Sequence, residues 1–180
     1  MIFISGVHGV GKSFFCNLVK ETLGIAFFSA SDLIKDRKMR DFPTDKHITN
    51  IEENQQYLLT AVNDLRDELG EFLLDGHFCL LNSDGRITRI SLNTFTNLKP
   101  DAIILLSESP EIIAKRLQER DSVKHTVDDI KIFQDEENKY ANEVSELLKI
   151  PIITSMGSND IDNAIEFIRV WGDIKDGGKV

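Results

Sequence analysis

The chain has 180 residues, of which 41% are hydrophobic and 28% charged, and its formal net charge is −9. These values are ordinary for a globular protein, and the length suits one α/β domain with at most small insertions. The acidic balance argues against an extended nucleic-acid surface or binding to an anionic membrane. No stretch approaches the length of a membrane span, and the first apolar run is too short for a signal peptide, so we expect a cytoplasmic protein.

Residues 6–13 read Gly-Val-His-Gly-Val-Gly-Lys-Ser and match G-x-x-x-x-G-K-[ST] at every constrained position. The apolar run at residues 2–4 predicts a buried strand before this motif, and the apolar spacing after Ser13 predicts a helix over about 12–23. In that context the backbone N–H groups of residues 9–13 and the positive end of the helix face a phosphate. The motif therefore predicts a loop that binds the phosphates of ATP, with a glycine-rich turn that binds nothing as the alternative.

Lys12 in this loop is expected to bridge the β and γ phosphates and so to act in catalysis, and the Ser13 hydroxyl to ligate Mg²⁺. The residues assigned to nucleotide binding are Gly6, His8, Gly9, Val10, Gly11, Lys12, Ser13 and Phe14.

A third strand is predicted within residues 71–76, and it ends in an acid, Asp75. Enzymes with a phosphate loop hold magnesium at such a strand end, so Asp75 is the second candidate metal ligand. His77 follows directly and is a candidate contact to the phosphates or the substrate, with a purely structural histidine as the alternative.

A second short strand is predicted at residues 25–28, and a helix should begin at Ser31 or Asp32. The stretch 35–47 is locally basic in an otherwise acidic chain. It is interpreted either as a solvated charged face or as a lobe that accepts the anionic part of a second substrate. The candidate acceptor contacts in this region are Asp32, Arg37 and Arg40.

Arg116 and Arg120 lie four residues apart on a helix whose start is predicted at Ser109. Both guanidinium groups should emerge on one face, where they are candidate catalytic groups that neutralise the transferring phosphoryl group as a lid closes. The alternative is an exposed face on which they pair with Glu119 or Asp121.

The rest of the chain continues the alternation of helices and short apolar strands. The further predictions are a helix to about residue 69, a strand at 102–106, a long helix over about 130–147, a strand at 151–154 and a last helix at 161–168. Together they predict a five-stranded parallel sheet with helices on both faces and the ligand at the carboxyl ends of the strands. We expect a single domain over residues 1–170, with an acceptor-lobe insertion at about 32–70, a lid at about 116–128 and a flexible tail at 171–180.

On these motifs the chain resembles the nucleoside monophosphate kinase-like P-loop kinases, and within them most closely the archaeal-type adenylate kinases. The resemblance covers about residues 1–168 and lies in the phosphate loop, Asp75-Gly76-His77, the strand at 99–106, the two lid arginines, and Gln134 with Asn138. Residues 85–90 read Gly-Arg-Ile-Thr-Arg-Ile, where archaeal-type enzymes have G-Y-x-P-G-L-P. The resemblance implies ATP and Mg²⁺ as cofactors and a nucleotide-like small molecule as the second substrate.

We therefore expect a kinase that transfers the γ-phosphoryl group of Mg-ATP to a nucleotide-like acceptor, with a nucleoside monophosphate first among the candidates. One alternative is a kinase of a non-nucleotide hydroxyl, with Asp32 or His77 as the base. The other is a switch that binds and hydrolyses a nucleotide to control a protein partner.

Overall fold

The computed structural model describes residues 1–41, 51–82, 84–121, 126–157 and 160–176, and within these ranges not the side chains of 40, 41, 51–53, 121 and 173–176. Five parallel strands form one sheet in the order β2-β3-β1-β6-β7. Their bounds are β1 Ile2–Ser5, β2 Phe27–Ser29, β3 Leu73–Asp75, β6 Ala102–Ser107 and β7 Ile152–Met156. The predicted five-stranded parallel sheet is thus confirmed.

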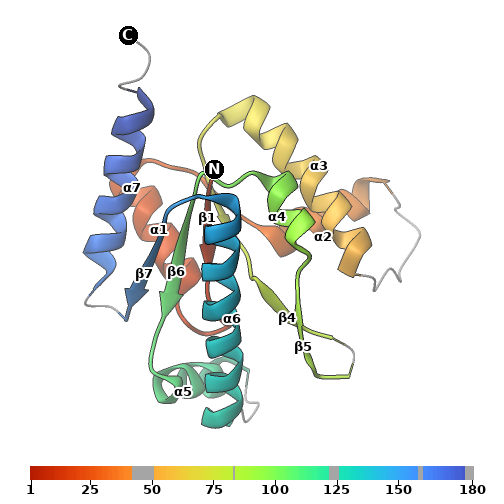
Figure 1. The fold of residues 1–180 in the computed structure, drawn as a ribbon, viewed down its shortest axis with the longest axis vertical. Coiled ribbons are helices and arrows are strands. Elements are labelled where there is room, and N and C mark those ends of the chain that lie inside the picture. Colours follow the sequence, from red (N-terminus) through yellow and green to blue (C-terminus); the bar gives the residue numbers. More distant parts are fainter. Residues whose placement is uncertain (42–50, 83, 122–125, 158–159, 177–180) are drawn as a thin grey trace.

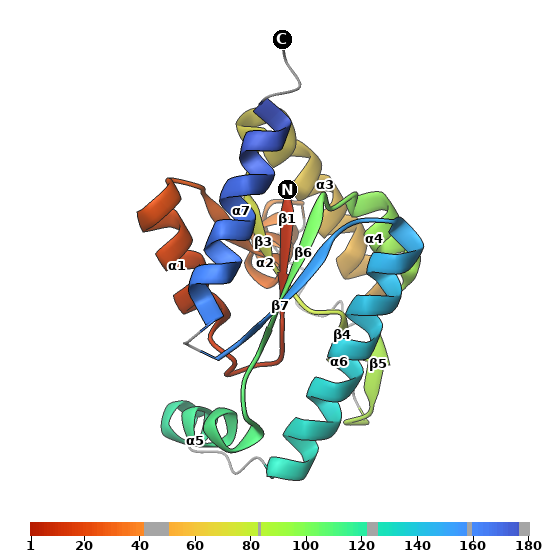
Figure 2. The same cartoon turned by 60° about the vertical axis from the view of Figure 1, so that its left-hand side comes forward.

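Helices cover both faces of this sheet (Figures 1 and 2). Their bounds are α1 Lys12–Leu23, α2 Ala30–Asp41, α3 Ile51–Leu69, α4 Leu92–Leu98, α5 Pro110–Asp121, α6 Val127–Leu148 and α7 Ile161–Asp176. One core includes Phe15 from α1 and Ile165 from α7, and a second core includes Val62 from α3, Phe95 from α4 and Val144 from α6. Because both faces are covered, all residues of β1 and β6 are buried, which explains their continuous apolar runs.

The helix ends follow local sequence signals. α1 ends at Gly24, which has φ 72° and donates its N–H to the carbonyl of Lys20 at 3.0 Å. The hydroxyl of Ser109 accepts the N–H of Ile112 at the start of α5. At the other end of the chain α7 continues to Asp176, so the segment expected to be a flexible tail from residue 171 is helical as far as that residue.

Between β3 and β6 the structure contains a β-hairpin and a short helix, which the sequence patterns did not predict. The strands β4 Cys79–Leu81 and β5 Ile87–Arg89 pair antiparallel, and α4 follows them. Asn82 lies between the two strands, where its side-chain oxygen accepts the N–H groups of Asp84 and Arg86. The two strands are only three residues long, too short for a clear alternation of apolar and polar residues.

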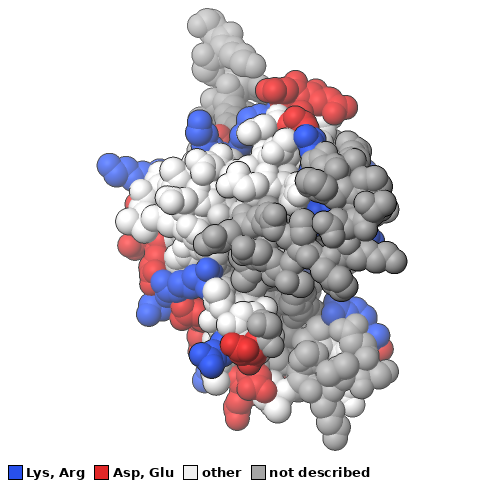
Figure 3. Space-filling model, turned by 90° about the vertical axis from the view of Figure 1, so that its right-hand side faces the viewer, with Lys and Arg blue, Asp and Glu red and all other residues white. Residues whose placement is uncertain are grey.

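Helices α2 and α3 pack against each other and form a lobe beside the sheet (Figure 1). The basic residues of α2 contact α3: Arg37 pairs with Asp64 at 2.7 Å, and Lys38 lies over the ring of Tyr57. On the face in Figure 3, the described Lys and Arg side chains are interspersed with Asp and Glu side chains. Among the described helices, none combines the length and the apolar character that a membrane span requires.

Candidate active site

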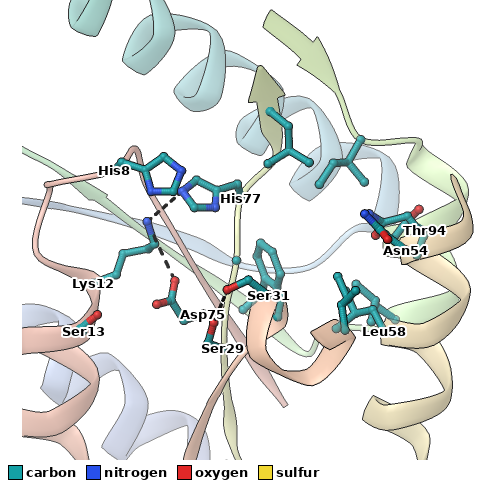
Figure 4. Close-up of a pocket in the computed structure, with 18 of the residues that line it drawn as sticks. His8, Lys12, Ser13, Ser29, Ser31, Asn54, Leu58, Asp75, His77 and Thr94 are labelled. Atoms are coloured by element: carbon teal, nitrogen blue, oxygen red, sulfur yellow. Dashed lines mark hydrogen bonds and ion pairs between the residues drawn. The ribbon is translucent and has the colours of Figure 1, made fainter. Parts of the chain in front are cut away.

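A cavity of about 650 Å³ opens beside the phosphate loop, where β1 and β3 end. Its two ends differ in chemistry, as Figure 4 shows. The phosphate-loop end is lined by Lys12, Ser13, Asp75, His77 and Arg120, which come from α1, the end of β3 and α5. The opposite end is lined by side chains of α3 and α4, namely Asn54, Gln55, Leu58, Thr94, Phe95 and Leu98.

The phosphate loop is shaped by glycines with positive φ angles, Gly6, Gly9 and Gly11. A Cβ atom at Gly6 would lie 2.5 Å from the backbone oxygen of Leu106, so no other residue fits between this loop and β6. Gly11 is the N-cap of α1 and provides no side chain to cap the first turn. The first N–H groups of α1 therefore remain available to an anion, and the loop fits a bound phosphate.

Lys12 is buried at the centre of this end, with 8% of its surface exposed. Its Nζ atom donates to the carbonyl of Gly6 at 2.6 Å and lies 3.9 Å from Oδ1 of Asp75. It also lies 3.1 Å from Nε2 of His77, which accepts a hydrogen bond from the lysine ammonium and therefore carries no proton itself. Burial lowers the pKa of Lys12, although the Asp75 carboxylate opposes this. Burial and the neighbouring Lys12 lower the pKa of His77 to about 2, so its imidazole is neutral at neutral pH.

The candidate magnesium ligands Ser13 and Asp75 line the same cavity. The side chain of Asp75 is 14% exposed, and burial raises the pKa of its carboxyl while Lys12 acts in the opposite direction. A hydroxyl and a carboxylate are the hard oxygen donors that Mg²⁺ takes, usually together with water and substrate phosphates. The two side chains therefore fit a magnesium ion next to a bound phosphate.

The structure places the two arginines that were expected in a lid beside different cavities. Arg116 donates to the carbonyl of Val10 at 3.0 Å, pairs with Glu108 at 3.4 Å, and lines a second cavity of about 450 Å³. Arg120 lines the first cavity together with Lys12. The exposed ring of Phe14 borders both cavities. The two arginines thus lie on one face of α5 but border different cavities in this conformation.

The expected acceptor contacts are less well placed than the phosphate-loop residues. Asp32 is not among the residues lining either cavity, although its charge contributes to the raised pKa of Asp75. Arg37 also lies outside both, because it pairs with Asp64 of α3. The side chain of Arg40 lies outside the described residues. His77 does line the cavity, and its ring lies 4.4 Å from that of His8.

Glu137 on α6 lies behind the cavity and not on its wall, and sequence reasoning missed its role in holding the adjoining segments together. It is fully buried and accepts hydrogen bonds from the Ser5 hydroxyl and from the N–H groups of Phe78 and Cys79, the last two at 2.9 and 2.7 Å. These bonds connect the start of the phosphate loop to the segment that follows His77. Burial raises the pKa of Glu137, while the three hydrogen bonds lower it. A carboxylate on the apolar face of α6, in line with Tyr140 and Val144, was the available signal.

Gln134, one turn earlier on α6, is satisfied by the backbone. Its amide accepts the N–H of Glu108 at 3.3 Å and donates to the carbonyl of the same residue at 3.0 Å. These two bonds fix the segment that connects β6 to α5. Arg116 and Arg120 both lie on α5.

The comparisons with known proteins agree with this geometry. Residues 5–133 match the sequence family described as "AAA domain". A protein of Methanocaldococcus jannaschii named "Putative adenylate kinase" is 27% identical over 122 residues, which cover 66% of this chain and 58% of that protein. A protein of the same name from Thermococcus kodakarensis is 29% identical over 120 residues, covering 67% and 56%. The chain thus spans less than two thirds of the length of these relatives.

Two solved structures share the fold. A gluconokinase from Sinorhizobium meliloti is 14% identical with a TM-score of 0.60, covering 99% of this chain and 97% of that one. Shikimate kinase from Aquifex aeolicus is 16% identical with a TM-score of 0.54, covering 98% of both chains. The predicted resemblance is confirmed by the relatives, and the fold is that of small P-loop kinases. Since the family match covers most of its length, the chain belongs to the AAA domain family, as a compact phosphate-loop protein of that group.

Proposed function

We propose that this protein is a magnesium-dependent kinase that transfers the γ-phosphoryl group of ATP to a small molecule bound in the 650 Å³ cavity. The observation that supports this most is the length of that cavity: it begins at Lys12 and Asp75 and extends to α3 and α4. A site for nucleotide binding alone needs no such space beyond the phosphates. The relatives named adenylate kinase make a nucleoside monophosphate the first acceptor to test.

The roles of the residues follow from where charge must be balanced. The loop N–H groups and Lys12 bind the donor phosphates, and Ser13 and Asp75 hold Mg²⁺, which neutralises charge between the phosphates. Arg120, on the same cavity, stabilises the transferring phosphoryl group. Such catalysis consists mainly of positioning and charge neutralisation, so no further chemical group is required.

The second cavity is proposed as the place of the donor's base and ribose. It adjoins the phosphate loop at Val10 and Gly11 and is bordered by Phe14 and Arg116. An aromatic ring and a guanidinium plane are both suited to stacking on a base. In this arrangement Arg116 contributes to donor binding, whereas Arg120 contributes to transfer.

We also propose that residues 1–170 act as one domain, with α2 and α3 as the acceptor lobe and the region around 116–128 as the lid. Contacts between α2 and α3, and the position of both beside the acceptor end of the cavity, support the first part. Residues 122–125 of the expected lid lie outside the described residues.

A matched pair of lysine variants tests the kinase. Lys12→Ala should lower single-turnover transfer from γ-labelled ATP by about 100-fold or more, because it removes a preorganised cation from the developing charge. Lys20→Ala, an exposed lysine on the same helix, should leave transfer unchanged. ATP hydrolysis that no acceptor accelerates would contradict the kinase and favour a nucleotide switch.

A further inference from the structure

We infer that Arg116 is a positioning residue for the phosphate loop: it holds the carbonyl groups of Gly9 and Val10 so that the N–H of Gly11 is directed at the donor phosphates. This inference rests on the proposed kinase function and goes beyond it, because it names a residue that shapes the phosphate site from outside the loop. The effect of Arg116 on donor binding then passes through the loop and does not depend on the base of the nucleotide.

Helix α5 packs directly on the phosphate loop, and Figures 1 and 2 show it next to the segment that connects β1 to α1. Ile113 and Leu117 of α5 are 0% and 4% exposed and belong to the same core as Val7 and Val10 of the loop. A Cβ atom at Gly9 would lie 2.9 Å from Cγ of Leu117 and 3.3 Å from Cγ2 of Ile113. The backbone of the loop is therefore in close contact with α5, and its conformation depends on that helix.

Arg116 forms the polar part of this contact. Its Nη1 atom donates to the carbonyl of Val10 at 3.0 Å and to the carbonyl of Gly9 at 3.4 Å. The N-cap of α1 is Gly11, whose carbonyl accepts the N–H of Phe15 at 3.0 Å. The carbonyl of Val10 precedes this first helical hydrogen bond, so α1 itself does not use it. Arg116 thus supplies a donor to a carbonyl that the helix leaves outside its own hydrogen bonds.

The orientation of the peptide group between Val10 and Gly11 follows from this contact. The peptide is trans and planar, so its N–H points to the side opposite its carbonyl. The carbonyl points to Arg116, and the N–H of Gly11 therefore points away from it. Gly11 also lines the first cavity beside Lys12, and its N–H donates to no other residue among those that the structure describes. This N–H is available to a phosphate, whereas that of Val10 is bound to the carbonyl of Val7 at 3.3 Å.

The guanidinium of Arg116 is itself held in place by an acid. Its Nη2 atom pairs with Oε2 of Glu108 at 3.4 Å, and Oε1 of that carboxylate accepts the N–H of Ser109 at 2.9 Å. The Glu108 side chain is 13% exposed, and its backbone is bound on both sides by the amide of Gln134. Arg116 is therefore fixed between the loop and a buried carboxylate. Protein groups alone orient the loop, which lowers the cost of ordering it around a phosphate.

The first test compares ATP with inorganic tripolyphosphate, which carries three phosphates but no ribose or base. Arg116→Ala should lower the equilibrium affinity for both by the same factor, about tenfold or more, because one hydrogen bond to a charged phosphate is weakened in each case. If only the affinity for ATP falls, Arg116 acts on the base, and the inference is overturned while the kinase function stands.

The parent protein provides the reference for this comparison, and it should bind both ligands in the presence of magnesium. Binding of ATP without binding of tripolyphosphate would show that the loop contributes too little to affinity, and it would also overturn the inference. Binding of neither ligand would contradict the kinase function itself.

Two further variants separate the geometry of Arg116 from its charge. Lys115→Ala removes one positive charge from an exposed position of α5 that lines neither cavity, and it should change both affinities by less than about twofold. Arg116→Lys keeps the charge but lacks the planar fork that reaches two carbonyls and Glu108 together, so most of the loss should persist. Full recovery in Arg116→Lys, or an equal loss in Lys115→Ala, would show that only the charge matters and would overturn the inference.

A spectroscopic test observes the peptide group directly. Val10–Gly11 is the only place in the chain where glycine follows valine, so labelling valine with ¹³C at the carbonyl and glycine with ¹⁵N marks this single peptide in an NMR spectrum. We expect its resonance to shift in Arg116→Ala before any ligand is added and to stay in place in Lys115→Ala. Tripolyphosphate should shift the Gly11 N–H strongly in the parent and weakly in Arg116→Ala. An unchanged resonance in Arg116→Ala, in a protein whose spectrum shows that it is folded, would overturn the inference.

Discussion

Lys12 and His77 are hydrogen-bonded to each other across 65 positions of the chain, with Nζ and Nε2 3.1 Å apart. The pair joins the start of α1 to the residue that follows the end of β3 by two positions. Because the lysine donates, the histidine must be neutral, and the pair holds one positive charge and not two. That charge is the one that the donor phosphates require.

The pH dependence of stability tests this pairing. In the folded protein the pKa of His77 is lowered from 6.5 to about 2, so the unfolded chain binds a proton below pH 6.5 that the folded chain does not. The stabilisation due to neutral His77 is therefore complete above pH 6.5 and is lost as the pH falls, by at most about 1.4 kcal/mol per pH unit. Denaturant titrations at several pH values should show this slope in the parent and not in His77→Gln. Equal slopes in both proteins would mean that His77 is protonated in the folded state.

Arg116 and Arg120 should have different kinetic effects, although they lie on one helix face. Arg120→Ala should slow transfer by about 10³-fold with little change in ATP affinity, because Arg120 borders the cavity of the transferring group. Arg116→Ala should mainly weaken ATP binding, because Arg116 borders the second cavity. Single-turnover transfer and equilibrium ATP binding, measured on both variants, separate the two effects. Identical losses would show that the arginines act as one clamp, and no loss in either would indicate a solvated face.

Asp75→Asn should raise the magnesium concentration needed for half-maximal transfer and lower kcat. The variant keeps the shape of the side chain and removes the charge that attracts Mg²⁺. Asp84→Asn is the control, because Asp84 is an exposed acid in the hairpin turn. Transfer is measured over a magnesium titration at saturating ATP. If the magnesium dependence of Asp75→Asn equals that of the control, Asp75 only pairs with Lys12.

Glu137→Leu should reduce the free energy of unfolding by at least about 3 kcal/mol. It leaves the hydroxyl of Ser5 and the N–H groups of Phe78 and Cys79 buried without an acceptor, at about 1–3 kcal/mol each. Glu136→Leu is the neighbouring control: its side chain is 32% exposed and pairs with Arg89, so its loss should cost about 1 kcal/mol or less. Chemical denaturation measures both. Similar losses would show that the buried bonds of Glu137 add nothing beyond an ordinary surface ion pair.

The sequence alone predicted those features of the protein that depend on residues close together in the chain. The phosphate loop, the buried strands around it, the end of α1 and the start of α5 at Ser109 depend on local backbone geometry and on apolar spacing, which a single stretch of chain displays. The order of the strands, β2-β3-β1-β6-β7, was not predicted, because it depends on which strands pair in three dimensions. The hairpin between β3 and β6 was missed because its strands of three residues are stabilised by pairing with each other and by packing on α6.

Only the tertiary structure determines which side chains line the same cavity or form hydrogen bonds with one another. Arg116 and Arg120 have the same spacing as any pair on one helix face, and their separation into two cavities depends on how α5 packs beside the phosphate loop. Glu137 reads as a charged residue of a surface helix until its helix is placed against β1 and the segment after β3. The same holds for Asn54 and Gln55, whose side-chain oxygens are buried without a hydrogen-bond partner among the residues that the structure describes. Burial and hydrogen bonding between distant segments depend on packing in three dimensions, whereas a sequence pattern records only what each segment prefers by itself.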